Sequence, residues 1–161
     1  LKKGKFSKLK LKKRKKSLIG HDVSMNKIIL DDIKYSKNNL FLQTHSTNPL
    51  LSINFINKSI KLFIKNKNRN DSLFSVDVFQ NRFYNQKIKP INHNLQKLKK
   101  TQDLSPIYME NSNLYIFSKK SFLKKKNRIG VKPLINISPR MESFDIDNND
   151  DWKLIERLVR K

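Results

Sequence analysis

The segment KTQDLSPIYMENSNLYIF, residues 100–117, combines a polar, irregular first part with a strand-like apolar end. Farther along the chain, the sequence FDID at residues 144–147 places Asp145 and Asp147 two positions apart. Residues i and i+2 of an extended segment point to the same side, so both carboxylates can face one cation. This combination favours a sugar or nucleotide site with a divalent cation over a nucleic-acid-binding surface.

The composition, taken alone, points toward nucleic acid. The chain has 161 residues, with 36 Lys and Arg against 13 Asp and Glu, a formal net charge of +23 and a pI of about 10.3. Proteins in this range often carry a basic patch that meets phosphate. However, the basic residues are Lys far more than Arg, Asn and Ile are frequent, and Ala is absent. Lys, Asn and Ile have AT-rich codons, so a biased genome explains the charge as simply as selection for RNA binding.

The residue types present exclude several classes of site. There is no cysteine, which excludes disulfides and thiolate metal sites. No apolar run reaches the roughly 18 residues needed to span a bilayer, and the charged start lacks the apolar core of a secretory signal. We therefore expect a cytoplasmic protein. Three glycines cannot assemble a Gly-rich phosphate loop. His45 and His93 lack the paired spacing of a metal site and are expected to be surface or hydrogen-bonded histidines.

The N-terminal residues 1–17 form a Lys-rich block. Ten of the first 16 residues are Lys or Arg, and no acidic residue appears before Asp22. Like-charge blocks are usually solvated, disordered arms and sometimes nucleic-acid-binding tails. We expect a disordered arm over residues 1–17 and a folded domain over residues 18–161. The competing hypothesis is a basic RNA- or ribosome-associated protein, in which deletion of the arm would abolish binding.

Alternating apolar patterns predict an α/β chain. Helical spacing follows Ser24 and Ser52, which can cap helices, and Asp150 or Asp151 is expected to cap a last helix. Residues 82–91 predict a hairpin or excursion. The predicted strands are residues 39–44, 73–79, 114–117 and 134–137. Strands separated by helices imply a mostly parallel sheet with helices on its faces.

Polar clusters occupy the places where such a sheet binds ligands. Ligands of open α/β sheets lie beyond the carboxyl ends of the strands. The clusters are residues 43–48, 102–113 and 145–147. Asp145 and Asp147 are the candidate ligands of Mg²⁺, which typically takes one or two carboxylates together with substrate phosphates. The alternative is an acidic turn that only caps the last helix.

Several motifs, in order, resemble one enzyme family. Residues 100–117 resemble the pattern R-x-Q-D-L-P-P-x-Y-x-E-N-G-x-x-Y-I-F, with Lys100 in place of the Arg and Ser112 in place of the Gly. The chain from Arg128 through FDID to Asp151-Trp152 resembles the family's I-G, E-x-x-D-I-D and D-W ending.

Two upstream stretches extend the resemblance. Residues 42–50 resemble the family's L-Q-x-T-S-P-L turn, and DSLFSV at residues 71–76 resembles its D-S-x-x-S-V strand. From about residue 18 to the C terminus, the chain therefore resembles the acylneuraminate cytidylyltransferases, the CMP-sialic acid synthetase family.

The resemblance implies an incomplete Rossmann-like nucleotidyltransferase fold. It implies transfer of CMP from CTP to the anomeric hydroxyl of a nine-carbon α-keto acid sugar, an acidic sugar of the sialic acid type, with release of pyrophosphate. Mg²⁺ is the implied cofactor, held by Asp145 and Asp147. No catalytic residue is assigned. The excursion from Arg82 to about Asn94 matches the part of the family that often serves homodimer contacts. The implied substrate-binding residues are Gln43, Asn48, Gln102, Tyr108, Glu110 and Asn111.

One family motif has no counterpart in the sequence. Family members carry a basic loop, I-P-A-R-x-G-S-K, that cradles the CTP triphosphate, whereas residues 1–17 are Lys-rich without such a strand or turn. We therefore expect the chain to lack roughly the first third of the fold. The isolated chain should bind CTP poorly and turn over little or nothing. A truncated product, one piece of a split enzyme and a non-catalytic pseudoenzyme all fit this expectation.

Overall fold

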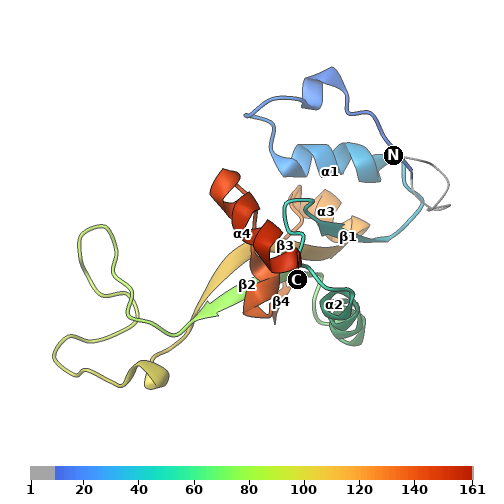
Figure 1. Ribbon diagram of the computed structural model, residues 1–161. Coiled ribbons are helices and arrows are strands. Elements are labelled where there is room, and N and C mark those ends of the chain that lie inside the picture. The colour runs from blue at the N-terminus through green and yellow to red at the C-terminus, as the bar shows by residue number, and fades with distance from the viewer. Residues whose placement is uncertain (1–9, 161) are drawn as a thin grey trace. The chain divides into compact units, whose positions relative to one another are not determined.

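The computed structural model describes residues 10–160 and divides the chain into two compact units, Leu1–Lys37 and Asn38–Lys161. The larger unit contains a four-stranded sheet with its helices, and the smaller unit contains helix α1 (Figure 1). Among the described residues, no helix is long and apolar enough to cross a bilayer.

The smaller unit pairs basic residues with the acidic end of one helix. A short 3-10 helix, η2 (Lys16–Leu18), precedes helix α1 (Met25–Lys34). Lys12 Nζ lies 2.6 Å from Asp31 Oδ2 and 2.8 Å from Asp32 Oδ1. Residues 1–9 of the expected Lys-rich arm lie outside the described residues, so the expectation for that arm stays a prediction.

Four strands form one sheet in the order β1-β3-β2-β4. Strand β3 runs antiparallel to both β1 and β2, and only β2 and β4 are parallel. The α/β class is confirmed, but the sheet is mixed, so the mostly parallel sheet that we expected is not confirmed. The strands are β1 (Leu40–Thr44), β2 (Ser72–Phe79), β3 (Ile107–Ser118) and β4 (Pro133–Ile137).

The connection between β2 and β3, residues 80–106, explains the mixed sheet. A parallel neighbour needs a crossover connection, usually an α-helix. Residues 80–106 contain only a short 3-10 helix, η3 (Thr101–Asp103), and an isolated bridge between Tyr84 and Pro90. Without a crossover helix, the chain returns antiparallel to β2. We call residues 80–106 the excursion loop, which extends away from the sheet in Figure 1.

Helix α2 (Ile53–Asn66) packs on the sheet and builds its core. Ser52 caps the helix as predicted, because its Oγ accepts a hydrogen bond from Phe55 N at 3.0 Å. Burial of each large apolar side chain contributes about 1.5–3 kcal/mol, so this packing holds the strands that carry the polar residues. The buried side chains of this core are Phe55, Phe63, Leu73, Leu114 and Ile116.

Helix α3 (Lys119–Lys125) follows β3 directly and was not predicted. Side chains alternate across β3, so Phe117 points away from the core that contains Ile116. The Phe117 ring instead packs against Phe122 of α3, with ring centroids 5.3 Å apart. Most residues of α3 are Lys, and Phe122 is its one buried aromatic residue. A helix with so few apolar residues has no apolar periodicity, so the sequence pattern did not predict it.

The last helix, α4 (Asn149–Val159), follows a short 3-10 helix, η4 (Arg140–Ser143). The predicted cap, Asp150 or Asp151, is wrong because Asn148 is the capping residue. Its Oδ1 accepts hydrogen bonds from the backbone N–H groups of Asp150 and Asp151, and Asp151 Oδ2 accepts in return from Asn148 N at 3.1 Å. The acidic run is therefore partly a capping box.

Candidate functional site

A β-bulge in β3 organises the polar side chains of the larger unit. Between Glu110 and Tyr115, four residues of β3 face the single residue Ser75 of β2. Ser112, inside the bulge, has a φ of 56°. Bulges bend a strand and re-aim its side chains, and they are common next to active sites. The residues on either side of this bulge contribute to one polar cluster.

Ser112 occupies a backbone conformation that favours glycine, and the resembling family pattern has Gly at this position. Left-handed backbone costs an L-residue about 1–2 kcal/mol, which glycine avoids. We expect Ser112→Gly to raise the free energy of unfolding by about 1 kcal/mol in urea titrations. Ser46→Gly is the control, because Ser46 is exposed and not among the residues with positive φ. A lower stability for Ser112→Gly than for the wild type would contradict this account of the bulge.

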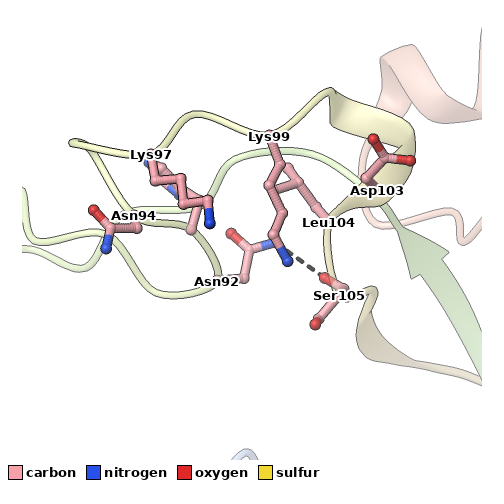
Figure 2. Close-up of a pocket in the computed structure, with 8 residues that line it drawn as sticks. Asn92, Asn94, Lys97, Lys99, Asp103, Leu104 and Ser105 are labelled. Atoms are coloured by element: carbon pink, nitrogen blue, oxygen red, sulfur yellow. Dashed lines mark hydrogen bonds between the residues drawn. The ribbon is translucent and has the colours of Figure 1, made fainter.

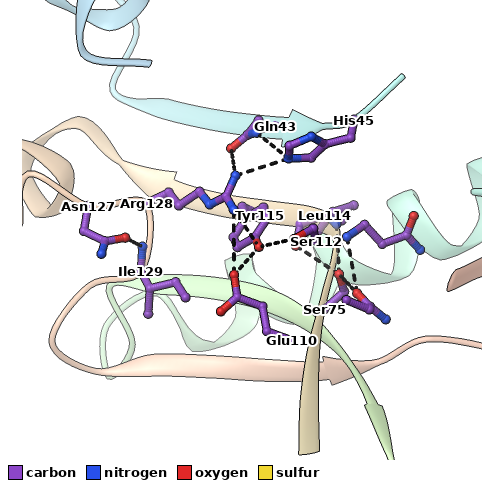
Figure 3. Close-up of polar contacts among 12 residues, drawn as sticks. Gln43, His45, Ser75, Glu110, Ser112, Leu114, Tyr115, Asn127, Arg128 and Ile129 are labelled. Atoms are coloured by element: carbon purple, nitrogen blue, oxygen red, sulfur yellow. Dashed lines mark hydrogen bonds and ion pairs between the residues drawn. The ribbon is translucent and has the colours of Figure 1, made fainter. Parts of the chain in front are cut away.

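Arg128 lies at the centre of the polar cluster (Figure 3). Its Nη1 donates to Gln43 Oε1 at 3.1 Å and lies 3.2 Å from His45 Nε2. Its Nη2 donates to Tyr115 Oη at 2.9 Å and lies 3.7 Å from Glu110 Oε1. The guanidinium carbon is also 3.6 Å from the centroid of the Tyr115 ring. These contacts join β1, β3 and the loop after α3 into one group, which we call the Arg128 cluster. The Arg128 side chain is only 14% exposed, so the centre of this cluster is largely shielded from water.

The Tyr115 hydroxyl connects Arg128 to Glu110. It accepts from Arg128 and donates to the Glu110 carboxylate. Burial, followed by the hydrogen bond to Glu110, raises the pKa of Tyr115 to about 12. The hydroxyl is therefore protonated at neutral pH and orients the carboxylate. The Glu110 side chain remains 42% exposed, which leaves it available to a ligand.

Neighbouring donors fix the tautomer of His45. Gln43 Nε2 lies 2.9 Å from His45 Nε2, and Arg128 Nη1 approaches the same ring nitrogen. Arginine can only donate, so His45 Nε2 is the acceptor and the ring proton resides on Nδ1. The Gln43 amide uses one N–H for His45 and one lone pair for Arg128. Among the described residues, one N–H and one lone pair of this amide remain for a ligand.

A pH dependence follows from His45. Burial lowers its pKa below 6.5, Arg128 lowers it further, and Asp145 only partly offsets these effects. Between the folded and unfolded pKa values, the unfolded chain binds the proton more readily. The stabilisation by His45 should therefore be complete above pH 6.5 and be lost as the pH falls through the folded-state pKa.

The measurement is the difference in unfolding free energy between the wild type and His45→Gln, followed from about pH 7.5 to about pH 5. We expect the difference to shrink as the pH falls. His21→Gln, in the smaller unit, is the control. A difference for His45→Gln that stays constant with pH would contradict the lowered pKa of His45 in the folded chain.

A hollow of about 600 Å³ lies where the carboxyl ends of the parallel strands β2 and β4 meet the segment around Asp145. Its polar lining includes Asp77, Ser138, Arg140 and Asp145. Asn111, from the β3 bulge, donates to Asp77 Oδ1 and to Ser138 Oγ, both at 3.0 Å. The bulge therefore joins this hollow to the Arg128 cluster. Carboxyl ends of parallel strands are where ligands of such sheets bind.

Two buried asparagines hold the segment that leads to Asp145. Asn113, which is fully buried, donates to the Glu142 carbonyl at 2.9 Å. Asn48, which is 4% exposed, donates to the Phe144 carbonyl at 3.2 Å. Asn48 was expected to bind substrate, but its amide nitrogen binds the protein backbone. The pair positions the Asp145 segment against the end of β1 and the bulge of β3.

The residues around Asp145 fit a cation. Asp145 Oδ1 is buried and has no hydrogen-bond partner among the described residues. A buried carboxylate oxygen without a partner costs free energy, which a bound cation would offset. Asp147 follows two residues later and is exposed. Within residues 10–160, no group of three or more His, Cys, Asp or Glu could hold a metal ion, but Mg²⁺ needs only one or two carboxylates when substrate phosphates and water complete its shell.

The structure brings together two of the expected substrate-binding residues, Gln43 and Glu110. Asn111 is buried, and both N–H groups of its amide are used inside the protein. Tyr108 is 47% exposed near the start of β3, and Gln102 lies in η3. In the described part of the chain, neither Tyr108 nor Gln102 shares a hydrogen bond with the Arg128 cluster.

Sequence reasoning missed Arg128, Tyr115 and Asp77 and treated His45 as isolated. Arg128 could have been found from the sequence, because it directly precedes the Ile-Gly of a family motif. Tyr115 reads as a core residue of a strand, which it also is. His45 had no local signal, since its partner Arg128 is 83 residues away, and Asp77 is likewise 34 residues from Asn111.

Comparison with known proteins finds a likeness in structure alone. No protein-family model matches the chain, and no curated protein matches it. Among solved structures, its fold is similar to that of 4-diphosphocytidyl-2C-methyl-D-erythritol synthase from Anaerococcus prevotii DSM 20548, with a TM-score of 0.59 at 10% sequence identity. The likeness covers 86% of this chain and 67% of that chain. At this identity the likeness shows the fold alone: the chain has an α/β fold similar to that of this synthase.

Proposed function

We propose that the chain carries the sugar- and metal-binding part of a cytidylyltransferase site. The reaction is transfer of CMP from CTP to a nine-carbon α-keto acid sugar of the sialic acid type, with release of pyrophosphate. The observation that carries the proposal is the convergence of Gln43 and Glu110 on Arg128, joined through the β3 bulge to the hollow that Asp145 lines. The linked sequence motifs and the shared fold support the same conclusion.

The Arg128 cluster suits an acidic, hydroxyl-rich sugar. Gln43 retains one donor and one acceptor, and the partly exposed Glu110 carboxylate can accept from sugar hydroxyls. Arg128 places a buried positive charge between them, which favours a carboxylate on the ligand. The rigid contacts among these residues pre-organise the donors and acceptors before the sugar binds.

Asp145 and Asp147 would hold Mg²⁺. When bound, the ion neutralises charge on the nucleotide phosphates and aligns the reacting groups. Asn48 and Asn113 fix the backbone before Asp145 and so keep its carboxylate at the hollow.

The excursion loop is proposed to serve homodimer contacts. Several of its large apolar side chains are exposed, as expected of a surface that meets another chain. These side chains are Tyr84, Ile88, Ile91, Leu95 and Leu98.

Calorimetric titrations test the proposed function against the competing RNA-binding hypothesis, which rests on the net charge of +23. The chain should bind N-acetylneuraminate saturably and should not bind the neutral sugar N-acetylglucosamine. Glu110→Gln should weaken sugar binding. Tight binding of a short RNA with a steep salt dependence, together with no sugar binding, would instead favour a nucleic-acid-binding protein.

A further inference from the structure

A second hollow, of about 350 Å³, lies within the excursion loop, and none of its lining residues lines the hollow at Asp145. It is formed by the second half of the loop (Figure 2). The residues that line it are Asn92, His93, Asn94, Lys97, Lys99, Asp103, Leu104 and Ser105.

Side-chain hydrogen bonds to the backbone give this hollow a defined shape. Asn92 Nδ2 donates to the carbonyls of Asn81 at 2.8 Å and Ser105 at 3.2 Å, which ties the two ends of the loop together. Arg82 Nη2 donates to the Lys99 carbonyl at 2.8 Å. These bonds connect residues 11 to 17 positions apart. These hydrogen bonds therefore hold the backbone of the loop in place around the hollow.

His93 brings buried hydrogen-bonding groups to the hollow. Its ring meets the Tyr84 ring edge-on, with centroids 4.8 Å apart and an interplanar angle of 79°. Both ring nitrogens are buried, and neither has a hydrogen-bond partner among the described residues. An imidazole always carries at least one N–H, so at least one buried donor lacks an acceptor. Unsatisfied buried donors are rare and destabilising, which points to an acceptor from outside the chain.

Lys97 and Lys99 make the hollow cationic. Both side chains extend from the same stretch of the loop toward Asn92 (Figure 2). Within residues 10–160, neither ammonium group takes part in an ion pair with a carboxylate. Asp103 is the one carboxylate in the lining. The lining thus has two ammonium groups and an imidazole donor but only one carboxylate. This excess of positive charge and of donors disfavours a metal ion and favours an anion that carries several acceptor oxygens.

We propose that this hollow binds a phosphate-class oxyanion, held by Lys97, Lys99 and a ring N–H of His93. Two ammonium groups match the two charges of a phosphate dianion better than the single charge of a carboxylate. The volume admits inorganic phosphate or the phosphate group of a small monoester. This site does not depend on the proposed cytidylyltransferase function.

Titration of inorganic phosphate into the full chain at constant ionic strength, followed by ¹⁵N NMR, tests the proposal. We expect saturable binding that shifts the His93 ring nitrogens and the backbone amides of residues 92–105. Lys97→Gln and Lys99→Gln should each weaken binding about tenfold, the size expected for loss of a charge-assisted hydrogen bond. Lys100→Gln is the matched control, because Lys100 lies in the same loop but does not line the hollow.

Several outcomes would overturn the proposal. Equal weakening by Lys97→Gln and Lys100→Gln would show that phosphate meets only the general positive charge of the chain. Absence of saturation, or no response of His93, would also overturn it. His93→Phe keeps an aromatic ring against Tyr84 and should weaken binding while leaving the thermal unfolding midpoint close to that of the wild type. A parallel titration with glycerol phosphate distinguishes the sources: equal affinity supports recognition of the phosphate group alone, and tighter binding supports a monoester.

Discussion

Replacement of Asp145 by asparagine is expected to weaken the Mg²⁺-dependent binding of CMP-N-acetylneuraminate by on the order of 100-fold, since even the partners of metal ligands typically contribute about 10- to 100-fold. Asp145 Oδ1 is buried without a hydrogen-bond partner in the described structure, so the substitution removes no hydrogen bond of this oxygen with the described residues. Asp147→Asn should have the same direction of effect. The measurement is a calorimetric titration with and without Mg²⁺.

The fold should tolerate this substitution, which separates a role in binding from a role in stability. Asparagine has the same shape as aspartate, and it removes a buried charge that costs free energy. We therefore expect the free energy of unfolding of Asp145→Asn to stay within about 1 kcal/mol of the wild type. Asp150→Asn is the matched control, because Asp150 is exposed and pairs with Lys153 at 3.0 Å. Equal loss of ligand affinity in Asp145→Asn and Asp150→Asn would contradict a metal-binding role for Asp145.

Replacement of Gly130 by alanine is expected to lower the free energy of unfolding by about 3 kcal/mol, at the upper end of overpacking effects. A Cβ at this position would lie 2.2 Å from Asp71 Oδ1 and 2.5 Å from Ser121 Oγ. The backbone cannot move away easily, because Gly130 N donates to Ser72 Oγ at 2.8 Å. The clash therefore falls on the loop that connects Arg128 to β4.

The Asp71 side chain also cannot easily move away from the added methyl group. It accepts hydrogen bonds from the backbone of Val131 at 2.8 Å and Lys132 at 3.0 Å. Although burial disfavours its charge, these N–H groups hold the pKa of Asp71 below its ordinary value. Urea unfolding of Gly130→Ala measures the effect, with Val131→Ala as the control at a 52% exposed neighbour. Equal stability of Gly130→Ala and the wild type would show that the contact between Gly130 and Asp71 is not close.

Local patterns predicted the elements that depend on local chemistry. Ser52 followed by helically spaced apolar residues predicted α2, and the alternation over residues 73–79 predicted β2, which spans Ser72–Phe79. The direction of β3 was not predictable in this way. It depends on whether residues 80–106 cross over the sheet, and no apolar periodicity in that stretch distinguishes a crossover from a return.

The sequence predicted the candidate-site residues that belong to recognisable motifs. It did not predict the residues that come together only because distant parts of the chain meet in the fold. Gln43 and Glu110 were identified from the family resemblance, whereas Asp145 was first identified from its spacing with Asp147. Arg128 became the centre of the cluster only because β1, the bulge of β3 and the loop after α3 meet around it. Asn48 was assigned to substrate from its motif, yet the structure uses its amide nitrogen to hold the Phe144 carbonyl. Asn48 Oδ1 is buried without a hydrogen-bond partner among the described residues, so the predicted contact between Asn48 and substrate stays a prediction.

The most direct test of the central claim, that Gln43, Glu110 and Asp145 belong to one ligand site, is a ¹⁵N NMR titration of the chain with CMP-N-acetylneuraminate. In the presence of Mg²⁺, we expect saturable shifts at the side-chain amide of Gln43 and at the backbone amides of residues 110–115 and 142–147, with much weaker shifts when Mg²⁺ is absent. Absence of shifts at these positions, or shifts confined to exposed lysine-rich segments regardless of Mg²⁺, would contradict the claim.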